Sequence, residues 1–169
     1  MLFAFLYTTG PYPLSYNGWG DILVIVFFGF VPVGGTYYVQ ALTWTTDTTI
    51  ASLICGLLID TLLVVNNYRD READARSGKR TVIVRFGEKF GSYLYLMLGM
   101  TASLLCFWFL FEGHLYAALL PLLYLIPHFL TWKRMVRIHS GKKLNSILGE
   151  TSRNMLLMGI LLSIGFFLN

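Results

Sequence analysis

Charge is what this sequence has least of, since only 13% of its 169 residues are Asp, Glu, Lys or Arg. A soluble domain of this length exposes far more charge, so an ordinary soluble protein is excluded. Cysteine is also scarce: Cys55 and Cys106 both lie in apolar runs, and two such residues predict packing rather than a disulfide framework. The N-terminus has no basic segment and no small-residue cleavage site, so we expect no cleavable signal peptide.

Long uncharged runs dominate the rest of the chain, which is 56% hydrophobic. They cover residues 22–46, 90–111, 113–132 and 154–169. About 20 apolar residues suffice to cross a bilayer as a helix. The sequence therefore predicts an all-α transmembrane bundle that forms a single membrane domain over residues 1–169.

The runs and their breakers define the expected helices. Residues 1–9 predict the last turns of a partial span, and the Pro- and Gly-rich segment 10–20 predicts a connector. Pro32 removes a backbone donor and should kink the first full span. The five full spans are expected at about 21–40, 49–68, 91–111, 115–132 and 154–168.

The cations are confined to two segments. All 13 Lys and Arg residues lie in 69–89 or 133–153, which we expect to be loops on the same side because two spans separate them. The turns at 41–48 and 112–114 contain neither Lys nor Arg. The positive-inside rule places the basic loops in the cytoplasm, so the net charge of +4 reflects membrane topology and predicts no nucleic-acid partner.

Oxygen-bearing side chains recur where the second span meets the first basic loop. Asn66, Asp70 and Asp74 are four residues apart and should stack along one helix face, with Asn67 as a further donor. Neighbouring carboxylates repel unless a cation joins them, and a few hard oxygen ligands suit Mg²⁺. A solvated helix end with mixed charges is the alternative interpretation.

A basic stretch follows these oxygen ligands. Lys79 and Arg80 come directly after Gly78, and Arg85 lies a few residues further on. Such side chains bind the oxygens of phosphate groups, so the stretch is typical of a diphosphate site. The same charges would also be present if they only set the orientation of the chain.

Asp60 lies in the middle of an apolar span and should face the bundle interior, because a mid-bilayer carboxylate is costly. It is interpreted either as a contact for an aromatic substrate or proton, or as a hydrogen-bond partner of a neighbouring helix. His128 also lies in an apolar span, beside Pro127, and a packing or capping role is expected for it.

The block from Asn66 to Gly87 resembles the second aspartate-rich motif of the UbiA superfamily of intramembrane prenyltransferases. More narrowly, it is similar to the 1,4-dihydroxy-2-naphthoate polyprenyltransferases of menaquinone synthesis. Further similar stretches are Tyr7–Leu14, Gly35–Gln40, Leu144–Asn145 and Thr151–Arg153.

The resemblance implies a nine-helix bundle with one aspartate-rich motif in each half. This chain resembles only the C-terminal half, because no such motif precedes residue 60 and Met1 falls where the fourth helix is expected. We therefore expect an incomplete chain whose partner is a missing N-terminal half. One wall of the site would come from that half.

The function implied is Mg²⁺-dependent transfer of a polyprenyl group from a polyprenyl diphosphate to 1,4-dihydroxy-2-naphthoate, with loss of CO₂, in the bacterial cytoplasmic membrane. The residues implied for Mg²⁺ are Asp70 and Asp74, assisted by Asn66 or Asn67. Those implied for the substrates are Lys79, Arg80 and Arg85 for the diphosphate, Tyr38 (with Tyr37) for shielding the carbocation, and Asp60.

Other functions remain open at this point. The acceptor is alternatively 4-hydroxybenzoate or another aromatic ring. The chain is alternatively a catalytically silent membrane remnant, since one motif is missing. An ion-coupled transporter segment with Asp60 as a cation ligand is the alternative from another functional class.

Overall fold

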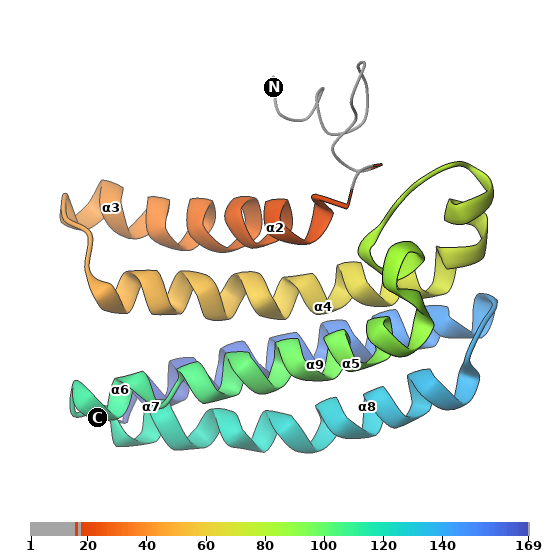
Figure 1. The fold of residues 1–169 in the computed structure, drawn as a ribbon. Coiled ribbons are helices and arrows are strands. Elements are labelled where there is room, and N and C mark those ends of the chain that lie inside the picture. The colour runs from red at the N-terminus through yellow and green to blue at the C-terminus, as the bar shows by residue number, and fades with distance from the viewer. Residues whose placement is uncertain (1–15, 17, 169) are drawn as a thin grey trace.

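The computed structural model describes residues 16 and 18–168, and all regular structure within them is helical (Figure 1). Five helical segments in this part are long and apolar enough to cross a membrane. They are Gly20–Ala41, Thr46–Arg76, Val82–Phe111, Leu115–Ile138 and Lys142–Phe167. The predicted all-α membrane bundle is confirmed, and the chain is a multi-pass integral membrane protein. The partial helix predicted at 1–9 and most of the connector lie outside the described residues.

The first span consists of α2 (Gly20–Val24), η2 (Ile25–Gly34) and α3 (Gly35–Ala41). The sequence predicts a kink at Pro32. Pro32 lies in η2, which is a π-helix over its whole length, and in a π-helix each backbone bond spans one residue more than in an α-helix. Having no backbone N–H, Pro32 donates no backbone hydrogen bond inside this stretch.

The second span, α4 (Thr46–Arg76), is longer than predicted. Its first turn is capped by the Thr45 side chain, which accepts a hydrogen bond from the Thr48 backbone N–H at 3.2 Å. The expected helix end at residue 68 was wrong, because α4 continues for two further turns. Hydropathy detects only the part of a helix that lies in lipid, and these charged turns extend past it.

Both predicted basic loops are therefore mostly helical. The link after α4 covers only 77–81, and α5 (Val82–Leu105) follows with a break at Gly87, whose φ is +86°. The bundle continues through α6 (Trp108–Phe111), α7 (Leu115–Leu119), η3 (Leu120–Tyr124) and α8 (Leu125–Ile138). The second basic turn holds η4 (Lys142–Leu144), and α9 (Asn145–Phe167) closes the chain.

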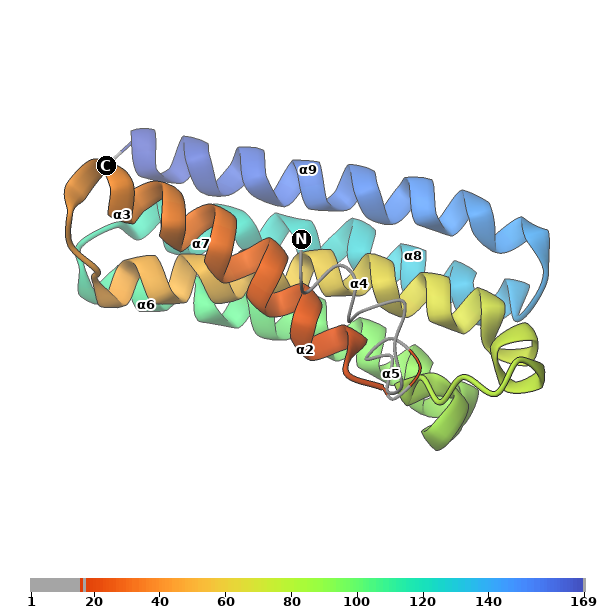
Figure 2. The same ribbon diagram turned by 90° about the horizontal axis from the view of Figure 1, so that it is seen from above.

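The spans run antiparallel, and the two basic turns lie at the same end of the bundle (Figures 1 and 2). Side chains join them directly. The Arg71 guanidinium contacts Glu88 Oε2 at 2.9 Å, and His139 Nε2 lies 3.1 Å from Glu88 Oε1. Arg71 also donates to the backbone oxygen of His139. The predicted placement of both basic segments on one side is confirmed.

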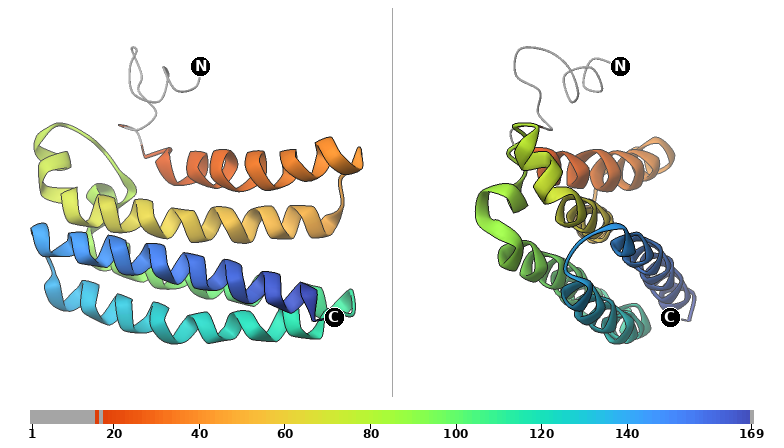
Figure 3. Two further views of the ribbon diagram at one scale, coloured as in Figure 1. Left: turned by 180° about the vertical axis from the view of Figure 1, so that it is seen from behind. Right: turned by 90° about the vertical axis from the view of Figure 1, so that its right-hand side faces the viewer.

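Helix α4 is central, since it packs against η2, α5 and α9 (Figure 3). Its contact with η2 depends on Gly29 and Gly56. A Cβ atom on Gly29 would lie 2.4 Å from the Ser52 backbone oxygen and 2.8 Å from the Gly56 Cα. Small residues at these positions let the two backbones approach closely, as is common in membranes.

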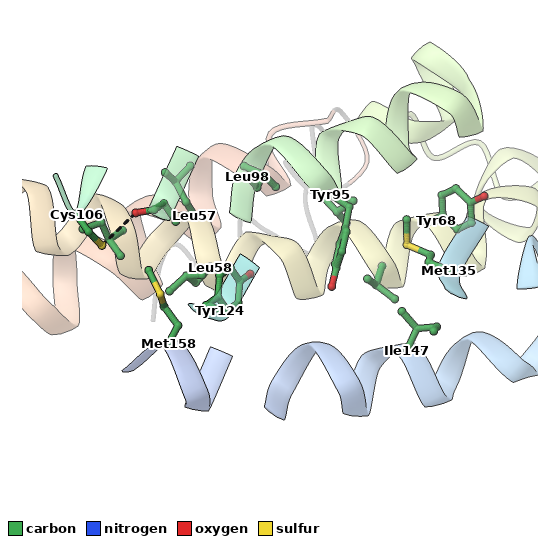
Figure 4. Close-up of a cluster of buried hydrophobic side chains, with 14 of the residues drawn as sticks. Leu57, Leu58, Tyr68, Tyr95, Leu98, Cys106, Tyr124, Met135, Ile147 and Met158 are labelled. Atoms are coloured by element: carbon green, nitrogen blue, oxygen red, sulfur yellow. Dashed lines mark hydrogen bonds between the residues drawn. The ribbon is translucent and has the colours of Figure 1, made fainter. Parts of the chain in front are cut away.

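The core between α4, α5, α8 and α9 contains aromatic and aliphatic side chains, among them Tyr95, Tyr124 and Met158 (Figure 4). His128 is fully buried between the two tyrosine rings, with centroid distances of 4.6 Å to Tyr95 and 5.0 Å to Tyr124. Its ring also fills the space above Gly99. The expected packing role of His128 is confirmed.

The two cysteines are free, as predicted. Cys106 is buried, and its thiol lies 3.4 Å from the Ala102 backbone oxygen (Figure 4). No disulfide joins the spans of the described part of the chain, so packing and hydrogen bonds hold them together.

Candidate functional site

The last turns of α4 form one wall of a cleft of about 370 Å³ at the basic end of the bundle. The start of α2 and the link 77–81 form the rest of the wall. The predicted residues Asn66, Asn67, Asp70, Asp74 and Lys79 all line this cleft. The remaining lining residues are Tyr16, Gly18, Gly20, Asp21, Leu63 and Thr81.

The spacing along α4 explains this arrangement. Residues 63, 67, 70 and 74 recur every three or four positions, and residue 66 lies one turn from 63 and from 70, so all five share one helical stripe. Asn67 and Asp74 are buried, while Asp70 is partly exposed. Because α4 continues to Arg76, the whole stripe lies on one rigid helix rather than partly in a loop.

Arg69 neutralises the first carboxylate. Its guanidinium makes a bidentate pair with Asp70, with Nε–Oδ1 and N–Oδ2 distances of 2.7 and 2.6 Å. The same side chain donates to the amide oxygens of Asn66 at 2.7 Å and Asn145 at 2.9 Å. Arg69 thus connects the α4 stripe to the start of α9. The sequence pattern alone assigned no site role to Arg69.

Lys79 neutralises the second carboxylate, with its Nζ atom 3.0 Å from Asp74 Oδ1. The hydrogen bond to Asp74 raises the pKa of Lys79 above its usual value, so this side chain stays charged throughout the physiological range. The ammonium group also lies 5.6 Å from the centre of the Tyr16 ring. A cation, a carboxylate and an aromatic face therefore meet at one rim of the cleft.

The oxygen atoms of the cleft are the candidate ligands for a divalent metal. Within residues 16 and 18–168, no group of three or more His, Cys, Asp or Glu side chains is placed to hold a metal ion. The cleft offers two carboxylates and two amides from α4. This set suits Mg²⁺, which binds through one or two carboxylates and takes its other ligands from water and phosphate. It does not suit an ion enclosed by protein alone.

Arg80 and Arg85 were predicted beside Lys79 but do not line the cleft. The backbone N–H of Arg80 donates to the Tyr16 oxygen at 2.8 Å, and its side chain is exposed. The Arg85 guanidinium lies beside Gly18. Arg80 therefore contacts Tyr16, and Arg85 lies beside Gly18, while neither arginine lines the cleft.

Tyr38 lies far from the α4 stripe. It belongs to α3, at the opposite end of the first span from the cleft, and about half of its surface is exposed (Figure 1). Tyr37 is on the same turn. The only aromatic side chain lining the cleft in the described part of the chain is Tyr16, which the sequence interpretation passed over.

Asp60 lies one turn beyond Leu63 toward the middle of the bundle, and only 1% of its surface is exposed. Its Oδ1 atom is buried and has no hydrogen-bond partner among the described residues. Asp21 interacts with it electrostatically across the contact between α2 and α4. Asp21 itself lines the cleft and was missed, although a single acid at the start of an apolar run is a detectable signal.

The model of the UbiA prenyltransferase family matches residues 1–167. The chain is similar to 1,4-dihydroxy-2-naphthoate octaprenyltransferases of Haemophilus influenzae and Escherichia coli. Each is 34% identical over 98% of this chain and 54% of the relative.

A protein of the same name from Mycobacterium tuberculosis is 42% identical over 62% of this chain and 36% of the relative. The chain thus spans about half the length, or less, of these curated relatives. No solved structure matches it.

Proposed function

The chain belongs to the UbiA prenyltransferase family, and from this membership we propose that it takes part in prenyl transfer to 1,4-dihydroxy-2-naphthoate in menaquinone synthesis. The donor would be a polyprenyl diphosphate. The observation that carries the proposal is the cleft in which two carboxylates and two amides of α4 converge with Asp21 and Lys79 at the basic end of the bundle. An anionic head group, with its hydrocarbon tail in the bilayer, fits that position.

The reaction needs a diphosphate to leave an allylic carbon. The C–O bond breaks with both electrons going to the diphosphate, the ring donates an electron pair to form the new C–C bond, and the ring carboxylate departs as CO₂. When bound, Mg²⁺ would supply positive charge that neutralises the departing diphosphate. Asp70 and Asp74 would hold the ion, with Asn66 or Asn67 as an additional oxygen ligand.

The basic groups of the cleft would act on the same charge. Lys79 is positioned by Asp74 at 3.0 Å and would donate to diphosphate oxygens. Arg69 holds Asp70 and Asn66 in place, so we assign it a positioning role. Arg80 and Arg85 lie outside the cleft and would attract the anion over a longer range.

We further propose that helices outside this sequence supply the opposite wall, within the same polypeptide or in a separate chain. The relatives are about twice as long as the matched region, which supports this arrangement. The exposed apolar groove of about 780 Å³ between η2, α4 and α9 also supports it. The basic end would face the cytoplasm, in agreement with the positive-inside rule.

The proposal is tested in bacterial membranes that contain this chain together with the part of the Escherichia coli relative that it does not match. Polyprenyl diphosphate, 1,4-dihydroxy-2-naphthoate and Mg²⁺ are added, and the prenylated product is measured by mass spectrometry. Asp70→Ala and Asp74→Ala should each lower the rate by at least about a hundredfold, the typical loss when a group stabilising transition-state charge is removed.

Glu72→Ala is the matched control, because Glu72 lies on the same helix, carries the same charge and is exposed outside the cleft. It should keep the wild-type rate. Activity that survives either Asp variant would refute the metal assignment. In a parallel assay with 4-hydroxybenzoate, prenylation of that ring and not of 1,4-dihydroxy-2-naphthoate would identify 4-hydroxybenzoate as the acceptor. No product in any combination would identify a silent membrane protein.

The Oδ1 atom of Asp60, which has no hydrogen-bond partner among the described residues, is an observation that favours ion-coupled transport instead. Uptake of a labelled cation into vesicles containing this chain alone, abolished by Asp60→Asn, would support that alternative. The prenyl-transfer proposal predicts no such uptake.

A further inference from the structure

A second polar pocket, of about 460 Å³, lies between α8 and α9 at the same end of the bundle. It shares no lining residue with the cleft. Lys133, Arg134 and Arg137 reach it from α8, and Arg153 reaches it from α9. Four cations from two helices thus surround a single concave site.

The floor of this pocket is a buried hydrogen-bonded network. Glu150 Oε1 pairs with the Arg134 guanidinium at 2.7 Å, and Asn154 donates to the Thr131 hydroxyl at 2.9 Å. Thr131 in turn lies 3.5 Å from Glu150 Oε2. Glu150, the one carboxylate among the described residues that line the pocket, is thereby engaged.

The other three basic side chains of the pocket are not neutralised by a described carboxylate, so they can bind an anion. Lys133, Arg137 and Arg153 are exposed, and the described residues hold no ion pair for any of them. The Lys133 ammonium lies 4.6 Å above the Phe129 ring, which holds it at the rim. The four cations outnumber the one carboxylate by three, so an anion is the complementary ligand.

The pocket also continues into apolar surface. Pro127 and Leu130, both apolar, also line it. Leu130 is shared with an almost wholly apolar groove of about 490 Å³ between α5 and α8, beside Ile126 and Phe129. A ligand that fits both surfaces has an anionic head and a hydrocarbon tail. The positive-inside rule accounts for cations at this end but not for their convergence over a buried polar floor.

We propose that this pocket binds the phosphate head group of an anionic glycerophospholipid, with Arg137 and Arg153 as the principal phosphate contacts. Basic pockets between transmembrane helices recognise anionic lipid head groups in this way. Guanidinium groups suit the task because they donate two parallel hydrogen bonds to phosphate oxygens. The inference is independent of prenyl transfer.

Native mass spectrometry of the purified full chain in a neutral detergent tests it. Phosphatidylglycerol and phosphatidylcholine with the same acyl chains are titrated separately. The wild-type chain should prefer phosphatidylglycerol. Arg137→Gln/Arg153→Gln should weaken that binding roughly thirtyfold, since each basic residue near an anionic lipid contributes about a fivefold factor.

Lys142→Gln/Lys143→Gln is the matched control, because it removes the same charge from exposed positions of the neighbouring turn, outside the pocket. It should change the affinity by no more than about twofold if the pocket is specific. Equal losses in both double variants would overturn the proposal in favour of diffuse attraction.

A third titration separates the two sources of phosphate. Inorganic phosphate at the same concentration should leave phosphatidylglycerol bound. Displacement of the lipid would identify a site for a soluble anion and overturn the lipid assignment. Both double variants alter exposed side chains only, so their unfolding temperatures should match that of the wild type and show that the comparison is between folded proteins.

Discussion

At the scale of single residues, Asp60 is the side chain whose environment differs most from what its chemistry requires. It is 1% exposed, one carboxyl oxygen has no partner among the described residues, and a second carboxyl, that of Asp21, is its electrostatic neighbour. A charged Asp at mid-membrane costs about 2.5–3.5 kcal/mol on insertion scales. A carboxyl group at such a position either is uncharged and only packs there, or has a function that requires it.

Asp60→Asn separates the stability of the fold from the use of this group. We expect the thermal unfolding temperature in detergent to stay unchanged or to rise, because the amide has the same shape and no charge to bury. Asp47→Asn is the comparison, since Asp47 lies in the first turn of α4 and accepts a hydrogen bond from Trp108 Nε1 at 2.8 Å. Removing the charge of Asp47 should lower the free energy of unfolding by about 0.3–1 kcal/mol and so lower the unfolding temperature. An equal loss in Asp60→Asn would mean that the Asp60 carboxylate is stabilised by a partner.

Arg69 shows how a residue gains its role from the fold. Its guanidinium contacts Asp70, Asn66 and Asn145, so it joins two groups of the α4 stripe to α9. The first two partners are near in sequence, but the third is 76 residues away. Only the third contact makes Arg69 a link between the cleft and the C-terminal half of the bundle.

At the scale of elements, the contact between η2 and α4 positions Asp21 against the α4 stripe. Gly29 is buried where the two helix backbones touch, and Gly56 lies opposite. The short distance between η2 and α4 is therefore possible because neither glycine has a side chain at the contact. Anything that separates them would also open the cleft at their end.

Gly29→Ala should destabilise the bundle by about 1–3 kcal/mol, the usual cost of overpacking, because the added methyl would lie 2.4 Å from the Ser52 backbone oxygen. Gly159→Ala in α9 is the control, since nothing lies within 4 Å of the added Cβ atom. It should leave the unfolding free energy unchanged or raise it by up to about 1 kcal/mol through helix propensity. Denaturant titration in mixed micelles measures both, and equal effects would refute the close contact.

At the scale of the whole molecule, both basic turns lie at one end of an antiparallel bundle, and the turns around residues 43 and 112 lie at the other (Figure 1). The cleft and the α8–α9 pocket share the basic end. One membrane surface thus carries both proposed anion sites, and the orientation of the chain decides which compartment supplies their ligands.

Single cysteines in a Cys55→Ala/Cys106→Ala background test this orientation in intact cells. Ser77→Cys and Ser140→Cys should react with a membrane-impermeant maleimide only after permeabilisation, because the positive-inside rule places them in the cytoplasm. Thr43→Cys and Glu112→Cys should react without it, and all four positions are exposed in the fold. Labelling of residues 77 and 140 from different sides would contradict the bundle itself. The reverse pattern would contradict only its orientation.

Much of this molecule follows from local pattern. The long apolar stretches, of which the second is interrupted by Asp60, determine five spans within the described chain and their alternation, because lipid offers no partner to an unpaired backbone group and so demands helices of membrane length. The spacing of Asn66, Asp70 and Asp74 determines that they share one stripe, since a helix repeats every 3.6 residues. These features need no information from distant parts of the sequence.

What faces that stripe was decided by the tertiary structure alone. Asp21 and Tyr16 come to the cleft from another segment, while Arg80, Arg85 and Tyr38 lie outside it. The helix ends in the structure also differ from the predicted ones, because charged helical turns outside the lipid give no hydropathy signal. Local pattern determines which face of its own helix a side chain occupies. The neighbours of that side chain depend on how separate helices pack. Asp21, for example, lies against the α4 stripe because η2 and α4 approach closely at Gly29 and Gly56.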